Sequence, residues 1–126
     1  MRRETRQYIC AELLNYQRSK NEISRICRKI DDLSLWPAYN KDYTVEQKMY
    51  LQDRLYMLRK ITEAIAAAEQ DLSAEERAVL RLKFWAPKPR LTDMQIAAEL
   101  NISVRTLYRH ISSICKMVGR FLGTDL

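Results

Sequence analysis

The chain has 126 residues, of which 47% are apolar and only two are glycine. This composition suits one medium domain or two very small ones built mostly of helix, and it argues against a conventional α/β enzyme. The net charge of +6 is uneven, because residues 1–71 carry 13 bases and 11 acids (+2) whereas residues 72–126 carry 9 and 5 (+4). A cationic surface of this kind favours a polyanionic partner such as nucleic acid, although many basic surfaces are merely solvated.

The cysteine and histidine content argues against a disulfide framework and against a zinc site. Cys10, Cys27 and Cys115 lie far apart without a C-x-x-C pair, and the sequence has one histidine. Cysteines at heptad positions are interpreted as small buried apolar residues and not as reactive ones. In the N-terminal MRRETRQYICAELLNYQ, charged residues interrupt the apolar stretch that a signal peptide needs. No apolar run approaches the roughly 18 residues of a membrane helix. We therefore expect a protein of the reducing cytoplasm with no metal, no cofactor and no membrane partner.

A long amphipathic helix is predicted from Ile9 onward. Its inward positions alternate by four and three residues, which is the heptad spacing of a coiled coil. These positions are Ile9, Leu13, Tyr16, Lys20, Ile23, Cys27 and Ile30. Because Lys20 does not suit an apolar seam, we expect it either to extend toward solvent or to fix the register or the choice of partner.

A second helix with the same spacing is predicted at Leu51, Leu55, Leu58, Thr62, Ile65, Glu69 and Leu72. In the intervening LSLWPAYNKDYT, Pro37 forbids a continuous helix, and Trp36, Tyr39 and Tyr43 are placed to cap the end of a hairpin. Each helix is apolar on one face, so it must be buried against the other helix or a second copy. We predict that residues 1–71 form an antiparallel helical hairpin serving as a dimerisation element or arm. Plain intramolecular support for the other half is an equal alternative.

The C-terminal half, residues 72–126, is predicted to begin with a capped helix. In LSAEERAVLRLKFW, Ser73 is followed three residues later by Glu76, the capping-box pattern that satisfies the unpaired groups of a helix start. Val79, Leu80, Leu82 and Trp85 follow with helical spacing. The helix is expected to stop in APKPR, because of its two prolines.

Two further helices are predicted to follow, joined by a tight turn. Thr92 and Gln95 repeat the capping-box pattern before DMQIAAEL, and Ser103 caps the helix VRTLYRHISSICKMV. Asn101 tolerates the left-handed conformation that a sharp helix end requires. We therefore expect a three-helix domain containing a helix-turn-helix.

The last helix is predicted to have a buried face and a reading face. A small residue, Ala97, lies where the two helices would touch, and the shared core is expected to contain Ile96, Leu100, Ile102, Leu107, Ile111 and Ile114. The opposite face would present Val104, Arg105, Tyr108, Arg109 and Ser112. An α-helix fits the DNA major groove, and arginine can donate two hydrogen bonds to a guanine edge. The N-termini of the two helices, at Thr92 and Ser103, also suit phosphate contact, because free backbone N–H groups point outward there.

The same residues carry a family resemblance. LSAEERAVLRL followed by IAAELNISVRTLYRHISSICKMVG resembles the LuxR/GerE type of helix-turn-helix and is similar to the last DNA-binding region of sigma factors. The sequence differs from that family at Asn101, where glycine is usual, and by the Pro-Lys-Pro-Arg insertion. The resemblance implies base contacts by Arg105, Tyr108, Arg109 and Ser112. It also implies that Thr92, Thr106, His110 and Lys116 lie nearer the phosphates, and we add Lys88, Arg90 and Ser103 to the predicted phosphate contacts.

In layout and length the whole chain resembles the RinA/ArpU-like late-transcription regulators of Gram-positive phages and prophages. This wider resemblance implies a small activator acting near a promoter. Its expected location is the cytoplasm of a bacterial host, in association with the nucleoid. Double-stranded DNA and a second copy of the chain are the expected partners, and RNA polymerase is a further candidate.

The sequence thus predicts a sequence-specific transcription regulator that reads the major groove with the helix 104–118 and is not an enzyme. The lone His110 has no nucleophile or carboxylate at suitable spacing for catalysis, and no glycine-rich phosphate loop is present. One alternative is a DNA-packaging protein like a terminase small subunit, which would form a ring of many copies. Another is a helical module that binds polymerase or another protein without DNA affinity of its own.

Overall fold

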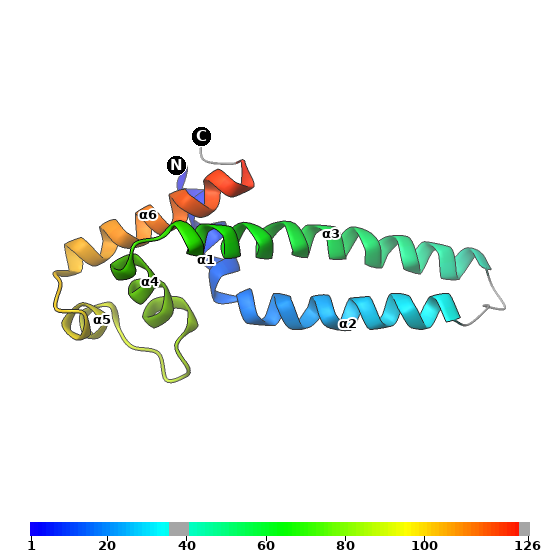
Figure 1. Ribbon diagram of the computed structural model, residues 1–126, viewed down its shortest axis with the longest axis horizontal. Helices are drawn as coiled ribbons and strands as arrows, with labels where there is room; N and C mark the ends of the chain where they lie inside the picture. Colours follow the sequence, from blue (N-terminus) through cyan, green and yellow to red (C-terminus); the bar gives the residue numbers. More distant parts are fainter. Residues whose placement is uncertain (36–40, 124–126) are drawn as a thin grey trace. The chain divides into compact units, whose positions relative to one another are not determined.

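All regular elements in the described part of this protein are helical. The computed structural model describes residues 1–35 and 41–123, which form α1 (Arg3–Leu14), α2 (Tyr16–Leu35), α3 (Lys41–Asp71), α4 (Ala74–Leu80), the π-helical turn η1 (Arg81–Trp85), α5 (Asp93–Glu99) and α6 (Val104–Leu122) (Figure 1). The predicted all-helical class is therefore confirmed. The predicted capping of the hairpin by Trp36, Tyr39 and Tyr43 concerns residues and side chains outside this description. Within it, no helix has the length and apolar character needed to cross a membrane.

The helices form two compact units whose boundaries differ from those expected. Unit 1 comprises Met1–Asn15 and Ala64–Leu126, and unit 2 comprises Tyr16–Glu63, so α3 contributes to both. The sequence pattern placed the division at Asp71, with all of α1 in the N-terminal half. Instead α1 packs against α6 and η1. Its inward residues Ile9 and Leu13 are completely buried and belong to the core of unit 1.

The predicted continuous helix from Ile9 to Ile30 is broken at Asn15. After the break the inward face of α2 is shifted from the predicted one: Ser19 and Ile26 are buried, whereas the predicted members Ile23 and Ile30 still pack around the core, together with Leu33. The expected seam residue Lys20 is exposed and its ammonium lies 4.7 Å from the centroid of the Tyr16 ring, a cation–π arrangement. The misfit of Lys20 in the heptad pattern is thus explained, because the inward stripe of α2 does not include it.

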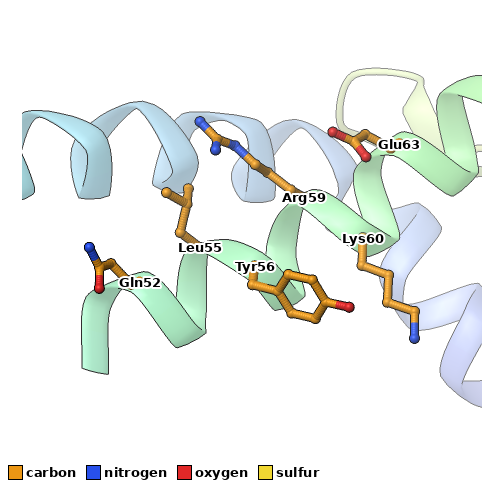
Figure 2. Close-up of a pocket in the computed structure, with 6 residues that line it drawn as sticks. All are labelled: Gln52, Leu55, Tyr56, Arg59, Lys60 and Glu63. Carbon is orange, nitrogen blue, oxygen red and sulfur yellow. The ribbon is translucent and has the colours of Figure 1, made fainter. Parts of the chain in front are cut away.

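Unit 2 is built by α2 and the first part of α3 lying side by side. Their shared core contains Ile26, Leu51 and Leu58, and the Arg54 side chain donates to the Glu22 carboxylate at its edge, with Nε 3.1 Å from Oε1. Figure 2 shows Leu55 and Arg59 reaching from α3 toward the neighbouring helix while Tyr56 and Lys60 project from the opposite side. The seam predicted along α3 is confirmed from Leu51 to Thr62, since its members are buried or half-buried.

Unit 1 has a continuous apolar core to which every helix in it contributes. Within it α1 packs against α6 and η1, while α4 and α5 also pack against α6 and η1. Burial of this apolar surface is the main stabilising contribution. The buried residues are Ile9, Leu13, Ala64, Ile65, Ala68, Leu72, Val79, Leu80, Phe84, Ile96, Ala97, Leu107, Ile111, Ile114, Cys115 and Val118.

Candidate nucleic-acid interface

A tight, capped turn joins α5 to α6 as the sequence predicted. The Thr92 side chain accepts from Gln95 N while the Gln95 side chain accepts from Thr92 N, which closes the capping box that starts α5. Asn101 has φ of 56°, the left-handed conformation expected for it. Ser103 then caps α6 by accepting a hydrogen bond of 3.0 Å from Thr106 N. These local contacts fix where α6 begins and therefore which of its residues face solvent.

One face of α6 is buried and the other carries cations. Leu107, Ile111, Ile114, Cys115 and Val118 are in the core. Four exposed basic residues lie along the opposite side and form a cationic row: Arg105, Arg109, Lys116 and Arg120. At 1.5 Å per residue the row is about 22 Å long. The α6 sequence VRTLYRHISSICKMVGRFL contains no acidic residue, so nothing on this helix offsets the positive charge.

Helix α4 holds α6 through a polar clamp centred on Glu76. Its Oε1 accepts from Ser73 N at 2.9 Å, completing the predicted capping box, and its Oε2 accepts from the Ser113 hydroxyl of α6 at 2.5 Å. Burial alone would raise the pKa of Glu76, but hydrogen bonds from Ser113 and Ser73, with the nearby His110, hold the pKa below its ordinary value of 4.5. Glu76 is thus ionised at neutral pH and ties the start of α4 to the middle of α6.

The π-helical turn η1 contacts α1 and α5 within unit 1. Lys83 Nζ lies 2.6 Å from an Asp93 carboxylate oxygen at the start of α5, and both side chains are about one-third exposed. Trp85 Nε1 donates to the Leu13 carbonyl of α1 at 3.0 Å. Together with buried Phe84, these contacts attach η1 to both α1 and α5. The helix expected to run from Ser73 into KFW is thus present, but its last turn is π-helical.

The four residues predicted to contact bases lie on one side of α6. Arg105, Tyr108 and Arg109 are exposed, with Tyr108 at 48% of its full accessibility, and Ser112 is half-buried. None of the three larger side chains is packed into the core. The arrangement therefore presents two guanidinium groups and one phenol together to solvent from the first turns of a helix.

Some of the residues predicted to contact phosphate are exposed, whereas others are engaged in helix caps. Lys88 and Arg90 are exposed between η1 and α5, and Lys116 is exposed on α6. The Thr92 and Ser103 hydroxyl oxygens are engaged in capping, and the Ser103 hydroxyl also donates to Thr106 Oγ1 at 2.9 Å. Ser103 therefore has no hydroxyl hydrogen left for a ligand, whereas Thr106 retains its own.

His110 is placed differently from the other predicted phosphate contacts. Its side chain is only 20% exposed and faces α4, with Nε2 3.2 Å from a carboxylate oxygen of Glu75. Within the described residues this nitrogen makes no aligned hydrogen bond. Because a carboxylate lies directly against the ring, a phosphate would meet negative charge there. His110 is therefore better explained as a contact between α4 and α6 than as a phosphate ligand.

Two relevant features were missed by the sequence reasoning. Arg120 continues the cationic row at a spacing of four from Lys116, and its basic side chain in an acid-free helix was a signal that could have found it. Ser113 holds Glu76, but the two residues are 37 positions apart and no local pattern connects them. Arg120 extends the candidate surface, and the contact between Ser113 and Glu76 explains how that surface is positioned.

Comparisons with protein-family models, with curated proteins and with solved structures found no match to this chain.

Proposed function

We propose that this protein is a sequence-specific DNA-binding transcription regulator that reads the major groove with α6. In this proposal α5, the turn at Asn101 and α6 act as a helix-turn-helix within a three-helix domain. The α2–α3 pair forms the helical hairpin that joins two copies. The proposed setting is that of a phage or prophage late-transcription regulator in the bacterial host cytoplasm, associated with the nucleoid.

The observation that carries the proposal is the exposed cationic row on an acid-free helix whose start is fixed by a cap. A protein helix fits the major groove, where arginine can pair with guanine O6 and N7. The first half of the row, Arg105 and Arg109, would meet base edges together with Tyr108. The second half, Lys116 and Arg120, lies two to four turns further along, where a straight helix leaves the curving groove and approaches the phosphates.

The first test measures affinity for DNA selected from a random pool. In the double variant Arg105→Ala/Arg109→Ala, each lost base contact should cost about 1 to 3 kcal/mol at the preferred site and relax base choice there. The matched control is Arg18→Ala/Arg28→Ala, which removes the same charge from exposed positions on α2. Equal losses in the two double variants would show that total charge, and not the α6 face, determines binding.

Salt dependence separates DNA binding from a protein-binding role. Phosphate contacts release counterions, so affinity should fall steeply as salt rises, and Lys116→Ala should reduce the slope of log K against log salt by about 1. An interaction module without DNA affinity would show no such slope. Absence of salt-sensitive binding to any selected DNA would therefore favour the alternative in which the module contacts polymerase or another protein.

We also propose that two copies pair through the outer α3 face, defined as Val45, Met49, Tyr50, Tyr56 and Met57. All five side chains are more than half exposed although all are large and apolar. At about 100° per residue the five positions fall within an arc of roughly 140° that does not include Leu51 or Leu58. Figure 2 shows Tyr56 projecting beside Lys60, on the side of α3 opposite Leu55. Apolar surface of this extent on one helix is typical of an interaction site.

Charge complementarity supports a second copy as the proposed occupant of the outer α3 face. In an antiparallel pair of α3 helices with a two-fold axis between Tyr56 and Met57, residue 53 lies opposite residue 60. Exposed Asp53 would therefore face Lys60 of the partner subunit, twice, with Tyr56 and Met57 packed between the two pairs. A dimer doubles the base contacts and selects paired half-sites, which a single helix does not.

Charge reversal tests this pairing. Asp53→Lys and Lys60→Asp should each weaken the dimer by placing like charges opposite one another, and the double variant should restore it. Mass in solution provides the measurement, with twice the 15.0 kDa chain mass expected for the unaltered protein. Tyr56→Asp should give monomers, whereas Met94→Asp, at an exposed apolar position of α5, should not. A monomeric wild type, or a ring of many copies as in a packaging protein, would refute the pairing.

A further inference from the structure

Cys10 and Cys115 bring two thiols together inside unit 1. Cys10 lies on α1 and Cys115 on α6, and their sulfur atoms are 3.5 Å apart although the residues are 105 positions apart. A disulfide needs a sulfur separation near 2.05 Å, so the atoms would have to move about 1.5 Å closer. The third cysteine, Cys27, lies in unit 2, where Arg59 Nη2 approaches its sulfur at 3.5 Å. The sequence interpretation of the cysteines as inert small residues did not include this contact.

The two thiols differ in accessibility and charge. Cys115 is completely buried, whereas Cys10 is partly exposed and lines a surface pocket with Arg3, Arg6 and Leu14. The hydrogen bond with Cys115, helped by the charges of Arg6 and Lys83 against the effect of burial, lowers the pKa of Cys10 to about 7. The same hydrogen bond and burial raise the pKa of Cys115. Above that pKa, Cys10 is a thiolate and accepts a hydrogen bond from the Cys115 thiol.

We propose that Cys10 and Cys115 are a peroxide-sensitive thiol pair that closes to a disulfide between α1 and α6. The Cys10 thiolate attacks one oxygen of hydrogen peroxide, the O–O bond breaks, and the sulfur gives up two electrons to become a sulfenic acid. The departing hydroxide takes a proton and leaves as water. Cys115 sulfur then attacks the Cys10 sulfur, the S–S bond forms, the S–O bond breaks, and the Cys115 proton leaves with that oxygen as a second water.

This order of steps follows from the surroundings of the two sulfurs. The thiolate is the reactive nucleophile, and it belongs to the partly exposed residue that peroxide can reach from the pocket. The buried Cys115 is within contact distance to resolve the sulfenic acid before further oxidation. The product would join α1 covalently to the helix that carries the cationic row. Because the thiol chemistry does not involve DNA, the inference stands apart from the proposed function.

The experiment treats the reduced, full-length protein with hydrogen peroxide and follows free thiols and intact mass. Wild type and Cys27→Ser should each lose two thiols and two hydrogen atoms in mass, with digestion yielding a linked peptide that contains Cys10 and Cys115. The denaturant midpoint of the oxidised wild type should rise, because the bridge restricts the unfolded chain. In Cys115→Ser, dimedone should trap a sulfenic acid on Cys10. Circular dichroism of each variant verifies that it is folded.

The pH dependence gives a second readout that does not need a variant. The oxidation rate of Cys10 should rise with pH through a midpoint near 7, where its thiolate forms, and fall below it. Three results would overturn the proposal: oxidation that begins at Cys27, a bridge that forms only between separate chains, or wild type that retains both the Cys10 and Cys115 thiols under peroxide that oxidises a small-molecule thiol.

Discussion

Replacement of Ser113 by alanine tests the polar clamp that positions α6. The Ser113 hydroxyl donates to the Glu76 carboxylate at 2.5 Å, and Glu76 also accepts from Ser73 N. A hydrogen bond to an ionised group contributes about 1.5 to 3 kcal/mol, and the half-buried position of Ser113 limits compensation by water. We expect Ser113→Ala to lower the free energy of unfolding by an amount in that range at neutral pH. The neighbouring Ser112→Ala should change it by about 0.5 kcal/mol or less.

The sign of the pH effect follows from the depressed pKa of Glu76. A carboxylate whose folded pKa lies below its unfolded value stabilises the protein above the unfolded pKa, and this contribution is lost as pH falls through the folded pKa. The difference in unfolding free energy between wild type and Ser113→Ala should therefore be constant from neutral pH down to about 4.5, the ordinary pKa of glutamate, and shrink below it. Urea unfolding followed by circular dichroism at several pH values measures this difference directly.

A double-mutant cycle isolates the Glu76–Ser113 contact from other effects. Glu76→Gln keeps an oxygen that can accept from Ser73 N but removes the charge, so the capping box can persist while the clamp weakens. We expect a coupling energy between Glu76→Gln and Ser113→Ala of about 0.5 to 3 kcal/mol. A coupling near zero, or a Ser113→Ala effect that is the same at acid and neutral pH, would refute the assignment of Glu76 as the group that holds α6.

Two further predictions concern the turn and the core beneath the candidate interface. Asn101→Gly should raise the free energy of unfolding by up to about 1 kcal/mol, because glycine adopts the observed φ of 56° without steric cost, whereas Asn101→Ala should lower it by a similar amount. Stabilisation by alanine, measured by urea unfolding, would contradict a left-handed residue there. Leu107→Ala should cost about 2 to 5 kcal/mol of stability, since Leu107 is fully buried. Tyr108 is the exposed neighbour of Leu107, so Tyr108→Ala should cost much less stability but should weaken DNA binding. Thermal melting and binding assays measure the two effects. A large loss of stability in Tyr108→Ala with a loss of binding only in Leu107→Ala would show that the two faces of α6 have been exchanged.

Features that depend on neighbouring residues were predicted correctly from the sequence. The caps at Ser73, Thr92 and Ser103 involve partners three residues away, and all three are present. The left-handed Asn101 follows from the same local chemistry. The buried face of α6 was also predictable, because the spacing of Leu107, Ile111 and Ile114 fixes one side of a helix.

Features that depend on distant contacts could not be predicted in this way. The heptad spacing continued across Asn15, but Ile9 and Leu13 are buried in unit 1. The face of α2 that packs against α3 includes the predicted Ile23 and Ile30, but it is centred on Ile26. The spacing shows which residues prefer burial and does not show which surface will bury them. For the same reason the sequence did not distinguish His110, which faces Glu75, from the exposed residues around it. The candidate site was thus predicted on α6, whereas the contacts that orient α6 required the structure.

Protection of guanine N7 from methylation tests the central proposal most directly, because this atom lies in the major groove. Bound to its selected DNA, the wild-type protein should protect particular guanines, and Arg105→Ala or Arg109→Ala should each remove protection at specific positions. The control variant Arg18→Ala/Arg28→Ala should leave the pattern intact. If every guanine stays reactive under saturating protein, or if the arginine variants on α6 give the wild-type pattern, α6 does not enter the major groove.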